Sequence, residues 1–376
     1  MVIGFCLFKY FPYGGLQRDF VRIGKTCMGR GHSIRVFTSS WEGEAPEGFD
    51  VIIVGTKGLA NHSRMLYFSK KAREFLNGVD VAVGFNKMEA LDVYYAADPC
   101  FKARAMERKG FFYRMGGRYR AYIEMEEAVF APSSKTRILL ISPKEKEKFI
   151  ASYKTPEERF YILPPGISRE RFSFSSPREL RKEARKELGI SGEETLLLMV
   201  GSAFRTKGVD RSIRALASLP VELRKKSRLY IIGKGDKGPF QRIARRNGVP
   251  DRVHFLGGRD DVPRCLLAAD ILLHPAYSEN TGTVLIEAMA AGLPVLATDI
   301  CGYAFHVSDA GAGLLIPSPY KQGVFNRMLR EMLVSPERNI WKTNGLGYVS
   351  KNDVFSMPEK AADVIESIAS GKRNAP

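Results

Sequence analysis

Two glutamates, Glu279 and Glu287, stand eight positions apart in the segment SENTGTVLIEAMAAGLPVLAT. The preceding residues DILLHPA predict a buried strand, and TGTVLIEAMAAG has the apolar spacing of a helix. Glu279 therefore falls in the connecting loop, and Glu287 falls in the helix on the side of that loop. Because a carboxylate accepts hydrogen bonds from sugar hydroxyls, one glutamate could hold a ribose and the other a hexose. Surface glutamates on an ordinary helix are the alternative, but they would not require the Ser-Glu-Asn-Thr-Gly loop.

The start of the same helix has the features of an anion site. Thr281, Gly282 and Thr283 would present backbone N–H groups that have no partner within the helix. Such amides, at the positive end of the helix dipole, bind phosphates. The segment therefore predicts a diphosphate lying between the two sugar rings.

Two cations follow an earlier strand. In GSAFRTKGVD, Arg205 and Lys207 come directly after the apolar run TLLLMV, in a predicted strand-to-helix loop. Loops of this kind lie at the carboxyl edge of a parallel sheet, where ligands bind. A guanidinium can bind a diphosphate bidentately, and an ammonium adds a point charge. Solvated surface cations are the alternative, and the position in the fold favours the phosphate site.

The first strand-to-helix connection holds a pair of glycines. Gly14 and Gly15 follow the strand-like run VIGFCLF, so backbone amides there could approach a ligand phosphate without a side chain in the way. A plain tight turn explains the pair equally well. Asp19 lies in the first turn of the next helix, close to the same loop, and is a candidate for substrate contact.

A rival hypothesis comes from GKGDKG, residues 233–238, which matches the dinucleotide fingerprint G-x-G-x-x-G. It predicts an NAD-dependent enzyme. The acidic partner expected about 20 residues further on is displaced, because Asp260 and Asp261 come late and follow Arg259. We interpret the glycines as a turn at the edge of a sheet, with NAD binding as the alternative function.

Strand-like and helical patterns alternate along nearly the whole chain and restart after the turn-rich segment LPPGISRERFSFSSP. This arrangement predicts an α/β fold of two doubly wound, Rossmann-like domains facing a cleft. The predicted parts are an acceptor-side domain at 1–166, a nucleotide-sugar domain at 167–350, and a segment at 351–376 whose helix packs back across the first domain. Strand-like runs are expected at 2–8, 33–39, 50–55, 79–85, 136–142, 195–202, 228–235, 252–258, 270–276, 294–298 and 313–318.

Composition limits the class of protein. The five cysteines are scattered and form no C-x-x-C, which is typical of free thiols in a reducing compartment. The N-terminal apolar run reads as a strand rather than a signal peptide, and no run is long enough to span a bilayer. The net charge of +17 predicts an anionic partner: nucleic acid, anionic lipid or a phosphorylated substrate.

Much of that charge lies in FKARAMERKGFFYRMGGRYRAY, residues 101–122, where cations alternate with aromatic residues. A solvated basic surface and a single-stranded nucleic acid site are the alternatives. The mixture is typical of the lipid headgroup boundary, so we predict docking on anionic lipid and no nucleic acid partner. The candidate docking residues are Lys102, Arg104, Arg108, Lys109, Phe111, Phe112, Tyr113, Arg114, Arg118 and Arg120.

The pair Glu279-x7-Glu287 followed by AGLPV resembles the signature of the retaining glycosyltransferases of family 4, which have the two-domain GT-B fold. Over essentially the whole chain the sequence resembles the lipopolysaccharide core glucosyltransferase I family, in the motifs FPYGGLQRDF, FTSSWEGE, VGFNKMEALDVYYAAD, FYILPPGI and DICGYAFHV. The resemblance implies transfer of a hexose, most often glucose from UDP-glucose, to inner-core heptose in α linkage. The acceptor would be lipid-anchored at the inner face of the cytoplasmic membrane, which predicts a cytoplasmic, peripheral enzyme. Another donor, such as a UDP-N-acetylhexosamine, stays open.

The resemblance also implies residue roles. Glu279 and Glu287 would contact the donor hexose and ribose, Lys207 and the neighbouring arginine the diphosphate, and Arg259 would lie beside the uracil. Many relatives have adjacent Arg-Lys, whereas Arg205 and Lys207 are separated by Thr206, so the register of the arginine contact is open.

The sequence has no D-x-D, so we predict no metal and no other cofactor. Arg205, Lys207 and helix-terminal amides would stabilise the departing UDP. Because both glutamates belong to one loop–helix unit, they do not readily flank a sugar as glycosidase carboxylates do. The prediction is front-face displacement, with Asp19 orienting the acceptor.

Overall fold

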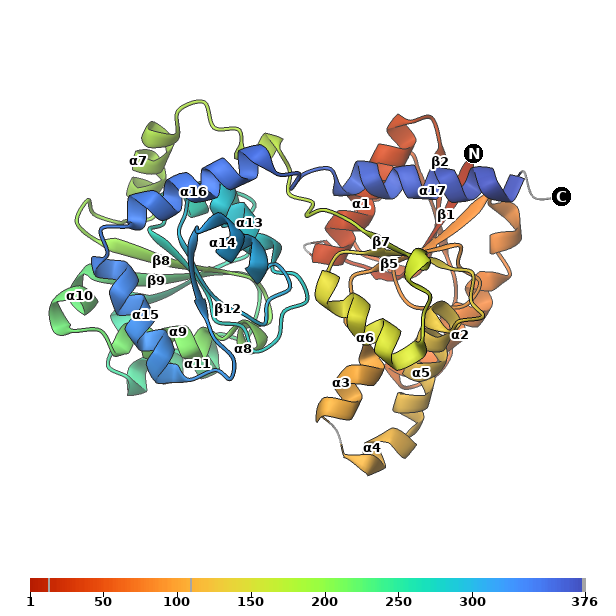
Figure 1. Cartoon of the computed structure of the whole chain (residues 1–376), viewed down its shortest axis with the longest axis horizontal. Helices are drawn as coiled ribbons and strands as arrows, with labels where there is room; N and C mark the ends of the chain where they lie inside the picture. The colour runs from red at the N-terminus through yellow and green to blue at the C-terminus, as the bar shows by residue number, and fades with distance from the viewer. Residues whose placement is uncertain (13, 109, 374–376) are drawn as a thin grey trace. The chain divides into compact units, whose positions relative to one another are not determined.

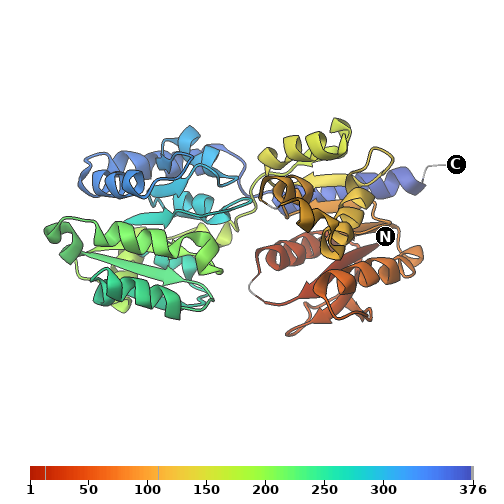
Figure 2. The same ribbon diagram turned by 90° about the horizontal axis from the view of Figure 1, so that it is seen from below.

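The computed structural model describes residues 1–12, 14–108 and 110–373 of the chain. It divides into two compact units (Figure 1). Unit 1 joins Met1–Gly166 with the segment that begins at Ser356, and unit 2 is Ile167–Phe355. Each unit is a parallel sheet with helices on both of its faces (Figure 2).

The sheet of unit 1 has seven parallel strands in the order β3-β2-β1-β4-β5-β6-β7. Its central strands are buried on both faces: Phe5 and Leu7 of β1 pack on one side, and Cys6 and Phe8 on the other. This explains the continuous apolar runs. The strands are β1 (Val2–Tyr10), β2 (Ser33–Trp41), β3 (Phe49–Ile53), β4 (Val81–Gly84), β5 (Val93–Ala96), β6 (Arg137–Leu140) and β7 (Phe160–Ile162).

Two groups of helices cover this sheet. Helix α1 (Gly15–Gly29) and the C-terminal helix α17 (Met357–Arg373) pack on one face, with Phe20, Ile23 and Cys27 of α1 buried as its spacing predicts. Helices α2 and α5 lie on the other face, and α3 and α5 extend away from the sheet with α4 at the tip (Figure 1). The remaining helices are α2 (Asn61–Arg73), α3 (Phe101–Arg108), α4 (Phe111–Met115), α5 (Gly117–Phe130) and α6 (Pro143–Tyr153).

The sheet of unit 2 has six parallel strands in the order β10-β9-β8-β11-β12-β13. Leu196 and Leu198 pack on one face, and Leu197 and Met199 on the other. The strands are β8 (Thr195–Val200), β9 (Ser227–Ile232), β10 (Val253–Gly257), β11 (Ile271–His274), β12 (Val295–Thr298) and β13 (Gly313–Ile316). The helices are α7 (Pro177–Glu187), α8 (Phe204–Lys207), α9 (Val209–Ala217), α10 (Val221–Lys226), α11 (Gly238–Arg246), α12 (Val262–Ala268), α13 (Thr283–Ala290), α14 (Ala304–Ala310), α15 (Gln322–Val334) and α16 (Arg338–Lys351).

The predicted fold class, two doubly wound parallel sheets, is confirmed. The sequence reading missed two short strands, β5 and β7. All five cysteines are free and buried. Within the described ranges, no helix has both the length and the apolar character needed to cross a bilayer.

Candidate functional site

The strand order of unit 2 reverses between β8 and β11, since β9 and β10 continue on one side of β8 and the chain then crosses to β11 on the other. In doubly wound sheets a ligand binds beyond the carboxyl ends of the two strands at this switch point. Arg205 and Lys207 follow β8, and Glu279 follows β11. The fold therefore brings the predicted phosphate-binding cations and a predicted sugar-binding carboxylate to one edge of the sheet.

The loops 201–208 and 275–282, which we call the switch-point loops, are bonded to each other. The Tyr277 backbone N–H donates to the Thr206 carbonyl at 2.8 Å. Gly208 has a φ of +77°, and a Cβ there would lie 2.1 Å from the Pro275 carbonyl oxygen, so only glycine allows this approach. The prediction placed Arg205 and Lys207 in an open loop. In the structure they lie in the four-residue helix α8.

A buried guanidinium holds the second loop. Arg211 Nη1 donates to the carbonyls of Pro275 and Ala276, each at 3.0 Å. The same guanidinium is sandwiched between the rings of Tyr277 and Tyr320, at 3.5 and 3.6 Å from their centroids. Arg211, which the sequence analysis did not single out, therefore holds the backbone that leads to Glu279.

Glu279 forms the centre of a charged cluster. Its Oε2 pairs with Lys207 Nζ and lies 3.0 Å from Nε2 of the buried His274. Burial disfavours the charged forms, but the His274 hydrogen bond and the Lys207 charge outweigh it and lower the pKa of Glu279 to about 2. Burial likewise opposes the imidazolium, yet hydrogen bonds to Cys301 and Glu279 raise the pKa of His274 to about 9. At neutral pH this is a carboxylate between two cations.

The helix α13 begins at Thr283, with Gly282 as its N-cap at a φ of +88°. Thr281 precedes the helix, and its carbonyl accepts a hydrogen bond from the Tyr303 N–H at 2.7 Å. Glu287 lies in the helix and is buried. The predicted order of loop glutamate, helix start and helix glutamate is thus present on one continuous segment.

The other predicted donor contacts differ in their surroundings. Arg205 is exposed. Arg259 follows the edge strand β10 and binds Asp261 bidentately, with Nε–Oδ1 at 2.7 Å and Nη2–Oδ2 at 2.5 Å, which raises the pKa of Arg259. Strand β9 separates β10 from β8. Arg259 thus lies two strands away from the switch point, and its charge is balanced by Asp261.

The glycines of GKGDKG have packing roles. Gly233 directly follows β9 at a φ of +144°, and a Cβ there would lie 2.4 Å from the Gly201 carbonyl oxygen. A Cβ on Gly235 would lie 2.9 Å from the Phe204 ring. The motif follows β9 rather than β8, so it does not stand at the switch point where a dinucleotide fingerprint belongs.

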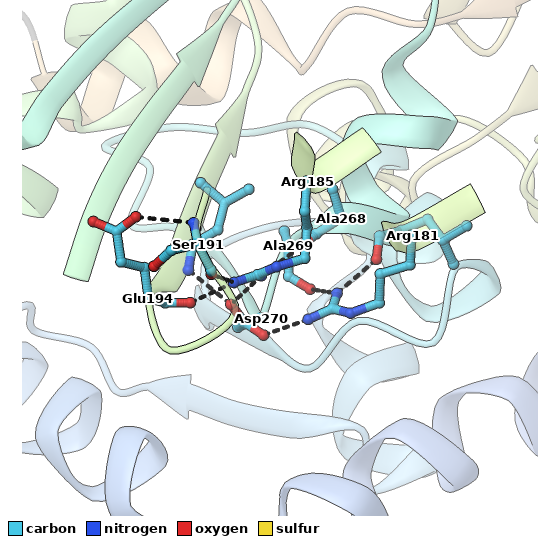
Figure 3. Close-up of polar contacts among 9 residues, drawn as sticks. Arg181, Arg185, Ser191, Glu194, Ala268, Ala269 and Asp270 are labelled. Carbon is cyan, nitrogen blue, oxygen red and sulfur yellow. Dashed lines mark hydrogen bonds and ion pairs between the residues drawn. The ribbon is translucent and has the colours of Figure 1, made fainter. Parts of the chain in front are cut away.

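A second charged cluster lies at the amino ends of the same strands. Arg181 and Arg185 of α7 converge on Asp270, the residue before β11, at 2.6 and 3.0 Å (Figure 3). Asp270 also accepts the Leu196 N–H of β8 at 2.7 Å. The network ties β8, β11 and α7 together, which positions the strands that carry the switch-point loops.

In unit 1, Gly14 is the N-cap of α1 and Gly15 its first residue. Neither has a positive φ; a Cβ on Gly14 would lie 1.8 Å from Gln17 Oε1, whereas one on Gly15 would meet nothing within 4 Å. Asp19 Oδ2 accepts a hydrogen bond from Tyr95 Oη at 2.9 Å, so it faces the carboxyl half of the sheet from α1.

The segment 101–122 forms α3, α4 and the start of α5. Phe111 and Phe112 are 66% and 86% exposed. Lys109 lies outside the described residues. Lys102 donates to the Ser152 carbonyl at 3.0 Å, and the Arg114 guanidinium lies 5.6 Å from the centroid of the Phe111 ring. Arg120 is exposed, and Arg108 is the last residue of α3. The remaining candidates line a cavity: Arg104, Tyr113 and Arg118.

Sequence reasoning missed His274, Arg211 and Asp270. His274 ends a strand that otherwise reads as apolar, and its place in ILLHPA was the signal available. Arg211 and Asp270 carry no local signal, because their partners lie 64 or more positions away.

Comparison with known proteins places the chain among sugar-transferring enzymes. A model described as "Glycosyl transferases group 1" matches residues 181–346. The chain is 46% identical, over 97% of its length and 98% of the relative, to the lipopolysaccharide glucosyltransferase WaaG of Escherichia coli (strain K12). A crystal structure of WaaG, a glycosyltransferase involved in lipopolysaccharide biosynthesis, matches at a TM-score of 0.92 with 46% identity, covering 96% of this chain and 99% of that one. HepE of Anabaena, solved with UDP-glucose, shares the fold at a TM-score of 0.76 and 18% identity, over 98% and 100% of the two chains.

Proposed function

Because the chain belongs to the family of lipopolysaccharide glucosyltransferases, we propose that it transfers glucose from UDP-glucose to a heptose of the lipopolysaccharide inner core. The new linkage is α, formed with retention at the donor carbon. The observation that supports this donor best is the Lys207–Glu279–His274 cluster on the switch-point loops. A lysine and a carboxylate joined there match a ligand that has a diphosphate next to a hexose.

The cluster residues and Glu287 each have a part in donor binding. Lys207 binds the diphosphate, Glu279 accepts hydrogen bonds from the hexose hydroxyls, and Glu287 accepts those of the ribose. Before the donor arrives, the ion pair holds both side chains in place, which lowers the entropy lost on binding. His274 supports Glu279 as an anion, and an anion can only accept hydrogen bonds.

The chemistry proposed is a front-face displacement. The bond from the anomeric carbon to the diphosphate breaks, and the acceptor oxygen attacks from the same face while the departing phosphate takes its proton. Lys207, Arg205 and the amides near Thr283 stabilise the charge on UDP. Asp19 orients the acceptor. These cations supply the positive charge that the diphosphate needs, so we propose that no metal ion or other cofactor is required.

An assay on purified inner-core acceptor tests this function. UDP-glucose should support transfer, and UDP-N-acetylglucosamine and NAD should not; EDTA should leave the rate unchanged. Lys207→Ala should weaken UDP binding in calorimetry, while Lys225→Ala, a matched change of an exposed lysine, should not. Binding of NAD without binding of UDP would contradict the proposal and favour the dinucleotide alternative.

We further propose that the protein acts at the inner face of the cytoplasmic membrane, docked through α3, α4 and the start of α5. Phe111, Phe112 and Met115 are more than half exposed, next to several cations. Exposed aromatic residues flanked by cations suit an anionic headgroup layer.

Co-sedimentation with vesicles tests the docking. Binding should require anionic lipid and weaken with salt. The double change Phe111→Ser with Phe112→Ser should reduce it, while Leu59→Ser, at a leucine that is 99% exposed on the same unit, should not. Equal binding to neutral vesicles, or a preference for single-stranded nucleic acid, would contradict it.

A further inference from the structure

The segment 101–122 has a second face that encloses a cavity in unit 1. The cavity has a volume of about 330 Å³, within the range of small-molecule sites. Its walls include Phe101, Arg104, Tyr113, Arg118 and Tyr122. All five belong to the segment 101–122, for which we predicted lipid docking. Only some of the basic and aromatic residues of this segment are therefore available for a lipid surface.

The cavity lies at the carboxyl edge of the sheet. Asn86 and Lys87, which follow β4, and Asp98, which follows β5, complete its lining. In unit 1 the strand order reverses between β1 and β4, and Asn86 Oδ1 accepts the Phe8 N–H of β1 at 2.7 Å. The cavity therefore begins beside the switch point of this sheet, which is the expected place for a ligand.

A buried carboxylate behind the lining holds two of the lining residues, Lys87 and Phe101, in place. Glu126 is fully buried, pairs with Lys87 Nζ, and accepts the backbone N–H groups of Phe101 and Lys102 at 2.9 Å each. It also accepts Tyr153 Oη at 2.6 Å. The charge of Lys87 is thus balanced, and the start of α3 is held against α5. The cavity is a built feature of the unit and does not arise from loosely packed loops.

The two arginines of the cavity, unlike Lys87, have no carboxylate among the described residues that balances their charge. In the described part of the chain, neither Arg104 nor Arg118 pairs with a carboxylate, and Asp98 is the one acid in the lining. Counting Lys87 with Glu126, the cavity keeps one positive charge in excess. Guanidinium groups bind phosphates and carboxylates bidentately. The rings of Phe101 and Tyr122, 4.9 Å apart, offer an apolar wall to the C–H face of a sugar, and Asp98 can accept from its hydroxyls.

We propose that this cavity binds an anionic sugar, a sugar phosphate or a sugar carboxylate, that is part of the acceptor glycolipid. The assignment to the acceptor rests on the proposed function. The cavity then recognises a charged unit next to the reacting sugar, while the outward Phe111 and Phe112 contact lipid. A phospholipid headgroup carries the same phosphate chemistry and is the competing source.

A direct binding experiment tests the cavity without relying on transfer. With the donor site saturated by UDP, ligand-detected NMR should show glucose 6-phosphate binding at least about tenfold more tightly than glucose, the effect of a charged hydrogen bond. Arg104→Gln should remove this preference, and Arg73→Gln, at an exposed arginine of α2, should keep it. Equal binding of the two probes by the unchanged protein would overturn the proposal.

Kinetics separate the two sources of phosphate. With a deacylated inner-core oligosaccharide, Arg104→Gln should raise the acceptor KM about tenfold at unchanged kcat and leave binding to anionic vesicles intact. Loss of vesicle binding with an unchanged KM would mean that the cavity binds lipid headgroups, against the proposal. If the unchanged protein fails to glucosylate this acceptor, the proposed function is wrong, and the NMR preference still decides the cavity.

Discussion

The two ends of the β8–β11 pair each hold a carboxylate between two cations, yet they are built differently. At the amino end, the guanidinium groups around Asp270 also donate to backbone carbonyls, including that of Ala269 (Figure 3). Arg181 donates to the Leu267 carbonyl as well. At the carboxyl end, Glu279 contacts the side chains of Lys207 and His274. Around Asp270, the arginine N–H groups bind the backbone of the fold. Around Glu279, the contacts join charged side chains to one another.

Backbone conformation separates the two ends as well. The switch-point loops contain residues at positive φ, among them Ala203 at +57°, Gly208 at +77° and Gly282 at +88°. Glycine adopts such angles without steric cost, but an alanine does not, and a strained residue like Ala203 is typical of functional sites, where surrounding contacts sustain the strain. We infer that the amino end supports the sheet and the carboxyl end binds the ligand. The predictions below separate these roles by measuring stability and catalysis on the same variants.

The largest effect is expected for Glu279→Gln. The amide keeps the shape but loses the charge that Lys207 and His274 surround, and it weakens the hydrogen bonds proposed to the donor hexose. We expect kcat/KM to fall by about 10²- to 10³-fold, the scale of one preorganised polar contact in a site. Steady-state kinetics together with a melting curve check this. A loss of folding that accounts for the lost activity would place Glu279 with Asp270 as a support of the fold.

The protonation of His274 provides a pH test of the same cluster. Its folded pKa of about 9 lies above the unfolded value of 6.5, so its stabilising contribution is complete below about pH 6.5 and disappears as the pH rises through about 9. The shift corresponds to about 3 kcal/mol of unfolding free energy. The pKa of Glu279, about 2, lies far below this range, so that group stays ionised.

Urea unfolding at several pH values measures the contribution. The difference in stability between the unchanged protein and His274→Gln should shrink between pH 6.5 and pH 9.5. Parallel stability curves for the two proteins over that range would show that His274 is neutral in the folded state.

Asp270→Asn is expected to affect the other end of the strands. Removing the charge leaves Arg181 and Arg185 without their counterion, so the unfolding free energy should fall by about 2–3 kcal/mol. At temperatures where the variant is folded, kcat/KM should change by less than about twofold. Asp270 lies at the amino ends of β8 and β11, whereas the switch-point loops follow their carboxyl ends, so we expect it to act through stability. Glu222→Gln, at an exposed helix glutamate, is the control and should change neither quantity. A large kinetic effect at full folding would break the contrast between the two ends.

The sequence was informative where chemistry is local. The Glu279–Glu287 segment and the cations Arg205 and Lys207 could be recognised because their positions relative to strands follow from short patterns. The pairing of Lys207 with Glu279 spans 72 positions and follows from the strand order, which periodicity alone does not determine. The same holds for the cavity in unit 1: the composition of 101–122 predicted a charged aromatic surface, but which residues point inward depends on the packing of α3 against α5.

The smallest effect is expected for Arg211→Lys, and it tests what holds the loop before Glu279. A lysine keeps the charge but loses the planar group that stacks between Tyr277 and Tyr320 and donates to two carbonyls. The loop before Glu279 should then loosen, raising the KM for UDP-glucose about fivefold, or roughly 1 kcal/mol, with little change in kcat. Arg214→Lys, on the same helix but 46% exposed, is the matched control and should leave the KM unchanged. If Arg211→Lys instead lowers the melting temperature and leaves the KM alone, the guanidinium belongs with Arg181 and Arg185 as a support of the fold, and the loop holds Glu279 without it.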